Sequence, residues 1–233
     1  MDQSAPLTEY PKAPDCKFCY RPEPWRAIWS TEHFHVQMGL GPLAEGHILV
    51  LSKTHYSCCA ELPSSHAAEW EYLVSKVKAA QVNVYGESLM FEHGRSGACV
   101  LPGHGDDHCY HAHLHLLPVD LNLADSIASD FPVITFDNWS EVRDRYTRTR
   151  RPYLLAASGD QIVYAETPDK IRSRYLRRIA AAALGRPELE DWVAFPGYMT
   201  VKAGLARLSP EMKRIMTEAG QDAHTACTEG RVV

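Results

Sequence analysis

Short apolar segments with different periods dominate the first 120 residues of the chain. Residues 33–36 alternate like a β-strand, and residues 47–51 form a continuous apolar run that is typical of a more buried strand. Apolar residues then recur at helical spacing between 70 and 84, with Ser64 as a predicted N-cap and Gly86 as the predicted end. Two further predicted strands follow, at 89–92 and 111–117. This order favours an α+β fold with a largely antiparallel sheet.

The pattern changes in the second half of the chain. A short helix is predicted around residues 139–146, and the apolar segments 153–157 and 162–164 flank a turn sequence as in a β-hairpin. Thr167-Pro168 predicts the start of another helix, because a hydroxyl N-cap and a proline in the first turn both favour one. We therefore expect four parts: a flexible N-terminal arm (1–15), a first domain (16–120), an α/β extension of a hairpin plus helices (121–208) and a weakly ordered tail (209–233).

The overall composition argues against several classes of function. The net charge is −5, so no broad basic surface for binding nucleic acid is expected. The N-terminal residues lack the basic and apolar regions of a signal peptide, and no apolar run reaches the roughly 20 residues of a membrane span. Seven cysteines, an odd number that includes adjacent Cys58 and Cys59, suit a reducing cytoplasm better than a disulfide framework.

Three histidines at alternate positions, His111, His113 and His115, are the strongest chemical signal in the chain. Side chains alternate across a strand, so this spacing predicts that all three imidazoles share one face. Such a row is solvated, binds a metal, or binds an anion such as phosphate. Six of the 12 histidines lie between residues 93 and 115, which favours a functional site over a chance pattern.

Residues 111–117, HAHLHLL, resemble the signature of the histidine triad superfamily of nucleotide hydrolases and transferases. A second motif agrees, because GHILVLSKTH at residues 46–55 is similar to a strand that precedes the helix in that superfamily, with Ser52 where proline is usual. The two motifs in this order make the resemblance specific over residues 16–118. It implies a histidine triad fold, with a C-terminal extension like that of some bacterial members.

The resemblance implies a role for each histidine of the triad. His113 would attack the α-phosphorus and form a nucleotidyl-histidine intermediate, which water or another acceptor then releases. His115 would donate hydrogen bonds to the phosphate oxygens. His111 would support the shape of the site or bind a metal. A neutral imidazole suits this chemistry, since its unperturbed pKa is about 6.5.

The chain departs from the family pattern at two places that concern the substrate. Just before the triad, where many members have other polar residues, it has Asp107 and His108. We expect Asp107 to lie in the substrate site and His108 to act as a general acid. The acidic residue with which members hold the ribose hydroxyls falls at Gly39, which implies an unusual nucleotide or leaving group. Lys53, in the second motif, is a further expected substrate contact.

Cys16 and Cys19 form a CxxC motif that lacks the strand and helix expected around a redox pair. Some bacterial members of the superfamily carry a CxxC here as half of a structural zinc site, and the resemblance implies His55 and His111 as the other ligands. A closed site with two cysteines and two histidines would add stability rather than catalysis. The alternative is a pair of unliganded thiols.

These residues leave several functions open. The leading expectation is a hydrolase that cleaves a nucleoside monophosphate from a conjugate, and a nucleotidyltransferase or phosphorylase would share its first half-reaction. A catalytically weak nucleotide-binding protein is a second alternative. A metal-dependent hydrolase with the three triad histidines as ligands is a third. By analogy with the superfamily we expect a homodimer. The cysteine pattern favours the cytoplasm, and no organic cofactor is expected.

Overall fold

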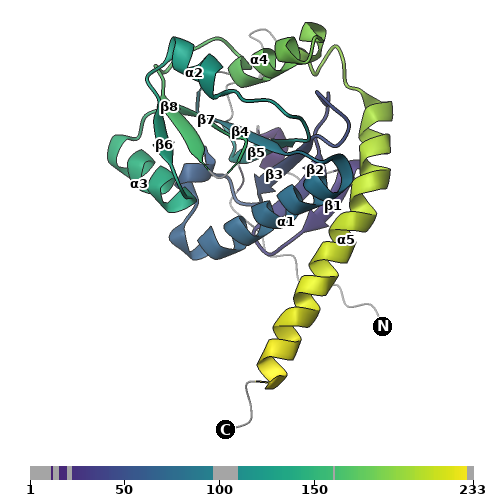
Figure 1. Cartoon of the computed structure of the whole chain (residues 1–233). Helices are drawn as coiled ribbons and strands as arrows, with labels where there is room; N and C mark the ends of the chain where they lie inside the picture. The colour runs from purple at the N-terminus through teal and green to yellow at the C-terminus, as the bar shows by residue number, and fades with distance from the viewer. Residues whose placement is uncertain (1–11, 13–15, 20–22, 97–109, 160, 230–233) are drawn as a thin grey trace.

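The computed structural model describes residues 12, 16–19, 23–96, 110–159 and 161–229 (Figure 1). Eight strands form one sheet in the order β1-β2-β3-β5-β4-β7-β8-β6, and each neighbouring pair is antiparallel. The strands are β1 (Ala27–Ser30), β2 (Phe34–Met38), β3 (Ile48–Ser52), β4 (Leu89–Gly94), β5 (His113–Leu117), β6 (Ile134–Phe136), β7 (Tyr153–Ala157) and β8 (Ile162–Glu166). The α-helices are α1 (Ala67–Tyr85), α2 (Ala124–Asp130), α3 (Trp139–Thr149), α4 (Tyr175–Ala183) and α5 (Tyr198–Glu229).

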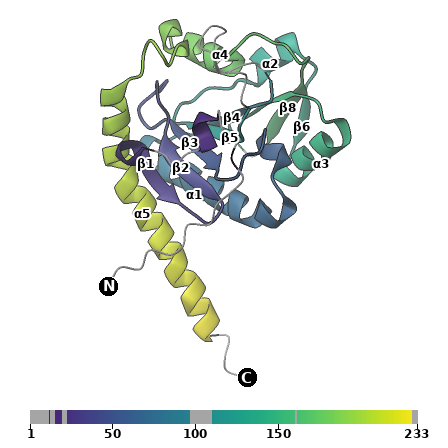
Figure 2. The ribbon, with the colours of Figure 1, turned by 180° about the vertical axis from the view of Figure 1, so that it is seen from behind.

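Helices cover the two faces of the sheet with two separate apolar clusters. One cluster joins α1, α3 and α5 to side chains such as Val50, Leu114 and Leu116. The other joins α2 and α4 to the opposite face, around Phe91 and Leu154. Figure 1 shows α1 in front of β2, β3 and β5, and Figure 2 shows the same strands from the other side, where α1 lies behind them. The β5 side chains that do not belong to the first cluster therefore lie on the sheet face opposite α1.

The α+β class with a largely antiparallel sheet is confirmed, as are the four predicted strands of the first domain and the hairpin of β7 and β8. Gly86 ends α1 with a φ of 92°, a left-handed conformation that favours glycine. The predicted start is displaced, because Ser64–His66 form a 3-10 turn and the α-helix begins at Ala67. The sheet also continues across residue 120, since β4 pairs with both β5 and β7.

The prediction that a helix begins at Thr167-Pro168 is wrong. Thr167 instead continues the strand pairing, because its N–H donates to the Pro152 carbonyl and its hydroxyl bonds the Ser96 hydroxyl at 2.6 Å. With that hydroxyl engaged, Thr167 does not cap a helix. The helix of this region, α4, begins eight residues later at Tyr175, directly after Arg174 in a left-handed conformation.

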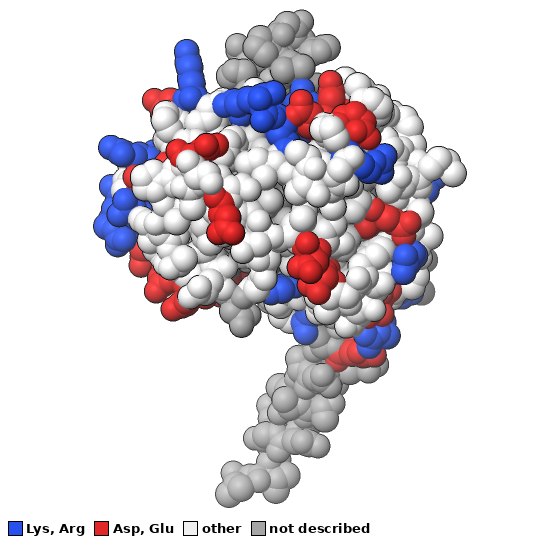
Figure 3. Space-filling view, turned by 45° about the horizontal axis from the view of Figure 1, so that its top comes forward, with Lys and Arg blue, Asp and Glu red and all other residues white. Residues whose placement is uncertain are grey.

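The last long helix differs from the weakly ordered tail expected from residue 209. α5 runs continuously across that boundary, and its buried side chains Val201, Leu208, Met212 and Ile215 form one stripe against the α1 side of the sheet. Their spacing of seven, four and three residues is a helical pattern. Among the described residues no helix is long and apolar enough to span a membrane. Figure 3 shows acidic and basic side chains interspersed over the face in view, separated by neutral surface.

Candidate active site

Strand β5 places His113 and His115 on the sheet face opposite α1. The strand lies between β3 and β4, with His113 opposite Leu51 and His115 opposite Leu49. The alternate residue Leu114 is fully buried against α1, which explains why the histidines face the other way. The predicted common face is therefore confirmed for these two histidines.

His111 lies two residues before β5 and has different neighbours. The segment is held on both sides, since the Ala112 N–H donates to the Tyr56 carbonyl at 2.7 Å and the Ser52 N–H donates to the Ala112 carbonyl at 3.2 Å. The His111 side chain is buried beside the CxxC motif. The expectation that all three imidazoles form one row on a strand is corrected, because the strand begins only at His113.

A main-chain carbonyl fixes which nitrogen of His113 carries the proton. Its Nδ1 lies 2.7 Å from the carbonyl oxygen of His111, and a carbonyl only accepts, so Nδ1 donates. Burial lowers the pKa of His113 below its ordinary value, which favours the neutral ring. In a neutral imidazole with a proton on Nδ1, the lone pair is on Nε2. His113 therefore presents Nε2 as a nucleophile.

A second main-chain group fixes the proton on His115 through His47. The Leu43 N–H donates to Nδ1 of His47 at 3.3 Å, so neutral His47 carries its proton on Nε2. That nitrogen lies 2.9 Å from Nδ1 of His115 and donates to it. The proton of His115 is then on Nε2, ready to donate to an anion. Burial lowers the pKa of His47 to about 3 and places that of His115 well below its usual range, so both rings are neutral.

Two aromatic rings pack against these imidazoles. Phe91 of β4 stacks on His115 with ring centroids 4.5 Å apart and an interplanar angle of 8°. Phe18, from the CxxC segment, stacks on His113 at 5.0 Å and 30°. These contacts limit ring rotation and exclude water from one side of each imidazole. The Nε2 lone pair of His113 and the Nε2–H donor of His115 thus belong to neighbouring rings, with centroids 4.9 Å apart.

The four predicted metal ligands come together in the structure. Cys16, Cys19, His55 and His111 each offer one atom, and these atoms lie within 4.8 Å of one another. The Cys16 Sγ and His111 Nδ1 atoms are 3.4 Å apart, and the Cys19 Sγ and His55 Nδ1 atoms are 3.2 Å apart. Bond lengths of ~2.3 Å for Zn–S and ~2.0 Å for Zn–N give ~3.5 Å between two such ligands in a tetrahedron.

The remaining nitrogen of His111 also suits a metal ligand. Nε2 donates to the Ser52 carbonyl at 2.8 Å, which leaves the lone pair of Nδ1 directed at the cysteines. A second hydrogen bond of this kind orients most metal-binding histidines. The donor set and its spacing therefore fit a tetrahedral zinc ion.

The other predicted site residues are placed less directly. Gly39 lies against the His47 ring, because an added Cβ atom would be 3.4 Å from Cγ of that ring. The Lys53 ammonium donates to the Thr31 carbonyl at the turn between β1 and β2. Asp107 and His108 lie outside the described residues. Substrate contacts by all four stay predictions.

Sequence reasoning missed His47 and Phe91 as parts of the site. Both signals were present, since His47 begins the second motif and Phe91 lies on a predicted strand. What the sequence does not contain is the strand register, which pairs Phe91 with His115 and brings His47 next to the same ring.

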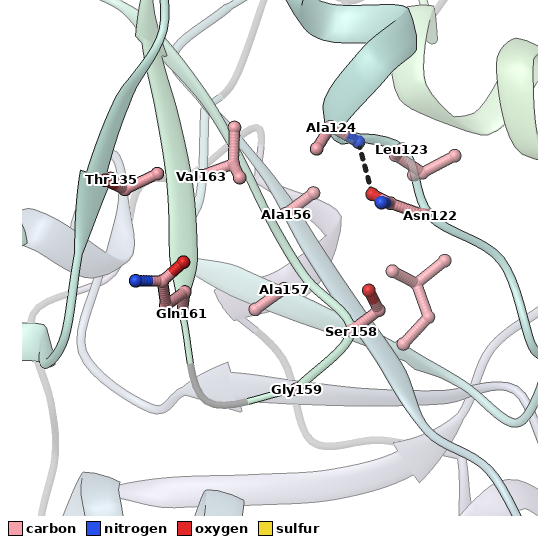
Figure 4. Close-up of a pocket in the computed structure, with 11 residues that line it drawn as sticks. Asn122, Leu123, Ala124, Thr135, Ala156, Ala157, Ser158, Gly159, Gln161 and Val163 are labelled. Atoms are coloured by element: carbon pink, nitrogen blue, oxygen red, sulfur yellow. Dashed lines mark hydrogen bonds between the residues drawn. The ribbon is translucent and has the colours of Figure 1, made fainter.

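Two cavities lined by described residues lie away from the triad histidines. One of about 460 Å³ lies between the start of α2 and the β7–β8 hairpin, lined by residues that include Asn122, Ser158 and Gln161 (Figure 4). Another of about 500 Å³ is lined in part by Arg145 and Glu166. No triad histidine lines either cavity.

Comparison with known proteins gives matches only among solved structures. No family model and no curated protein matches the chain. A hypothetical histidine triad nucleotide-binding protein of Sulfolobus tokodaii strain7 is 20% identical over 42% of this chain and 62% of that chain, with a TM-score of 0.32. A Hit-like protein of Bartonella henselae is 17% identical over 43% and 74%, with a TM-score of 0.32. Yeast Ap4A phosphorylase Apa2 is 12% identical over 84% and 81%, with a TM-score of 0.42.

These similarities are distant. The two sequence motifs of the chain give more specific information about the candidate site. The HAHLHLL run forms β5, the GHILVLSKTH motif supplies β3 beside it, and the two strands pair in register. The middle histidine is oriented through Nδ1 by a carbonyl of the same run. These are the residues that carry the resemblance to the histidine triad superfamily.

Proposed function

We propose that the protein cleaves nucleotide conjugates at the α-phosphorus, with His113 as the nucleophile. The hydrogen bond from His113 Nδ1 to the His111 carbonyl carries this proposal, because it leaves the Nε2 lone pair available for attack. The neighbouring His115, with its proton on Nε2, supports the same reading as a donor to the phosphoryl oxygens.

The reaction has two displacement steps. In the first, Nε2 of His113 bonds to the α-phosphorus while the bond from phosphorus to the leaving group breaks, and the leaving group departs with that electron pair. In the second, the oxygen of an acceptor bonds to phosphorus, the N–P bond breaks and its electrons return to Nε2. The hydrogen bond from His115 strengthens as negative charge grows on the phosphoryl oxygens.

The acceptor decides between a hydrolase and a transferase, and hydrolysis is the proposed reaction. Water as the acceptor releases a nucleoside monophosphate, whereas inorganic phosphate releases a nucleoside diphosphate. A panel of nucleoside phosphoramidates and dinucleoside polyphosphates, incubated with and without phosphate, separates the two by their products. Appearance of the diphosphate as the main product would favour the phosphorylase alternative.

The matched variant for this assay is His113→Asn, which keeps a donor near the position of Nδ1 but has no ring nitrogen to attack phosphorus. We expect no measurable turnover by this variant, with the unfolding midpoint of the wild type. Equal activity in both proteins would remove the nucleophile assignment and favour a role in nucleotide binding alone.

We further propose that Cys16, Cys19, His55 and His111 hold a structural zinc ion. When bound, the ion would cross-link the CxxC segment to the strand that carries His113. His111 supports this link in two ways, since its side chain offers Nδ1 to the metal and its carbonyl orients the nucleophile. The metal would thus stabilise the site without taking part in the chemistry. The homodimer remains a prediction of the family resemblance, and the cytoplasmic location remains a prediction from the cysteine pattern.

Zinc content and its coupling to folding test this second proposal. We expect Cys16→Ser and Cys19→Ser to lower zinc content and the unfolding midpoint, whereas Cys58→Ser, the same change outside the cluster, keeps the metal. With a chelator, activity should be lost no faster than the protein unfolds. Immediate loss from a fully folded protein would favour the metal-dependent hydrolase instead.

A further inference from the structure

A further histidine, His93, lies on the same sheet face as the two catalytic candidates, His113 and His115. His93 is on β4, two residues after Phe91, which pairs with His115 of β5. Continuing this antiparallel register by two residues sets His93 beside His113. The His113 ring is close enough to affect the charge of His93, because it contributes to the lowered pKa of His93. The His93 residue is only 8% exposed.

A main-chain N–H determines the tautomer of His93. The Leu176 N–H donates to its Nε2 at 2.9 Å. Burial lowers the pKa of His93 to about 3, so the ring is neutral and its one proton is on Nδ1. None of the described residues accepts a hydrogen bond from this buried Nδ1. A buried donor without an acceptor is destabilising, and such an exception in a site points to a missing ligand.

The C-terminal extension holds this arrangement in place. Leu176 lies in the first turn of α4, and its neighbour Arg177 is buried and donates to the carbonyls of Gly41 and Leu189. The Gly41 segment leads into Leu43, whose N–H fixes the proton on His47. One helix turn is therefore anchored to the site at two points, and the Leu176 N–H has little freedom to release Nε2.

We propose that His93 is a further substrate-binding residue of this site, whose Nδ1–H donates to a phosphoryl oxygen of the nucleotide substrate. Three neutral imidazoles would then act together: His113 attacks phosphorus, while His115 and His93 each donate to oxygen. Helix α4 contributes by preventing the other tautomer of His93. This inference rests on the proposed function, and it gives the extension a role in the chemistry.

Two variants separate binding of substrate from support of α4. In His93→Asn the amide NH2 takes the place of Nδ1–H, but nothing accepts from Leu176. In His93→Gln the longer amide reaches the place of Nε2 and accepts from Leu176, but the donor at Nδ1 is lost. We expect kcat/KM to fall by about 10²-fold in His93→Gln, similar to removal of one oxyanion donor, and by less than about tenfold in His93→Asn.

A purely structural role gives the reverse order, with His93→Gln active and His93→Asn impaired and less stable. That order, or equal losses in both variants, would overturn the inference. The result is distinguishable from failure of the proposed function, because His113→Asn is assayed beside them. If His113 is essential and His93→Gln is fully active, only the inference about His93 fails.

A measurement on the wild-type protein tests the proposal even if the variants do not fold. In protein labelled with ¹⁵N at histidine, the spectrum should show the His93 proton on Nδ1. Addition of AMP should shift this Nδ1–H signal together with the Nε2–H signal of His115. A shift at His115 with none at His93 at saturating AMP would contradict the proposal.

Discussion

At the scale of single residues, main-chain groups determine which imidazole nitrogens of the candidate site carry a proton. The carbonyl of His111 and the N–H groups of Leu43 and Leu176 each determine one imidazole tautomer. Main-chain groups do not titrate, so these assignments hold wherever the imidazole rings are neutral. A sequence shows that histidines are present, but it does not show which nitrogen of each ring is free.

The bond between His47 and His115 leads to a first prediction. We expect His47→Leu to lower kcat by about 10-fold to 100-fold, somewhat less than the ~10²–10³ of losing an oxyanion donor altogether, because His115 remains but its tautomer is no longer fixed. His47→Gln keeps an N–H near Nε2 and should retain more activity. Steady-state kinetics of both variants check this, and equal rates in the two would show that the proton on His47 is unimportant.

Glu92 leads to a prediction about pH. Its carboxylate is 1% exposed, and burial raises its pKa to about 7 although it accepts hydrogen bonds from the Cys59 N–H and the Tyr153 hydroxyl, each at 2.7 Å. In the unfolded chain the pKa is about 4.3. Between these values the folded state keeps a proton that the unfolded state has lost, so stability falls as pH rises, by up to ~3 kcal/mol.

Glu92→Gln is the control for this prediction, since the amide resembles the protonated acid and does not titrate. Urea denaturation at pH 5 and pH 7.5 should show the free energy of unfolding of the wild type falling relative to that of the variant. The comparison removes the opposite contribution of the buried histidines, which both proteins share. Parallel pH profiles would show that Glu92 is ionised throughout.

At the scale of elements, periodicity predicted the long and central segments but not the short and peripheral ones. β3, β4, β5 and α1 follow from their apolar patterns. The edge strands β1 and β6 have four and three residues and are partly or largely exposed. Their sequences therefore show little apolar periodicity. The predicted start of α4 was wrong for another reason, because the Thr167 hydroxyl makes a tertiary contact with Ser96 instead of a helix cap.

Helix α5 provides a stability test with a matched control. Met212 is 1% exposed within the stripe against the sheet, whereas Met199 on the same helix is 76% exposed. We expect Met212→Ala to lower the free energy of unfolding by ~2–5 kcal/mol, and Met199→Ala by less than ~0.5 kcal/mol. Denaturant unfolding of both variants measures this. Equal small effects would mean that residues beyond 209 do not pack as described.

At the scale of the whole molecule, the extension and the first domain form one continuous structure. β7 and β8 extend the sheet past β4, α5 packs on α1, and the first turn of α4 contacts the histidine face. The two sequence motifs located the site within this structure, and Cys16, Cys19, His55 and His111 converged as the resemblance implied. The contribution of α4 was not predictable, since it depends on a long-range hydrogen bond between Leu176 and His93.

The central claim is that an imidazole nitrogen of this chain bonds to phosphorus during turnover. Rapid acid-free quenching of the reaction with a nucleoside phosphoramidate, followed by mass spectrometry of the peptides, measures this directly. We expect a nucleoside monophosphate adduct on His113 that is absent in His113→Asn. Product formation with no adduct on His113, or with the adduct on another residue, would contradict it.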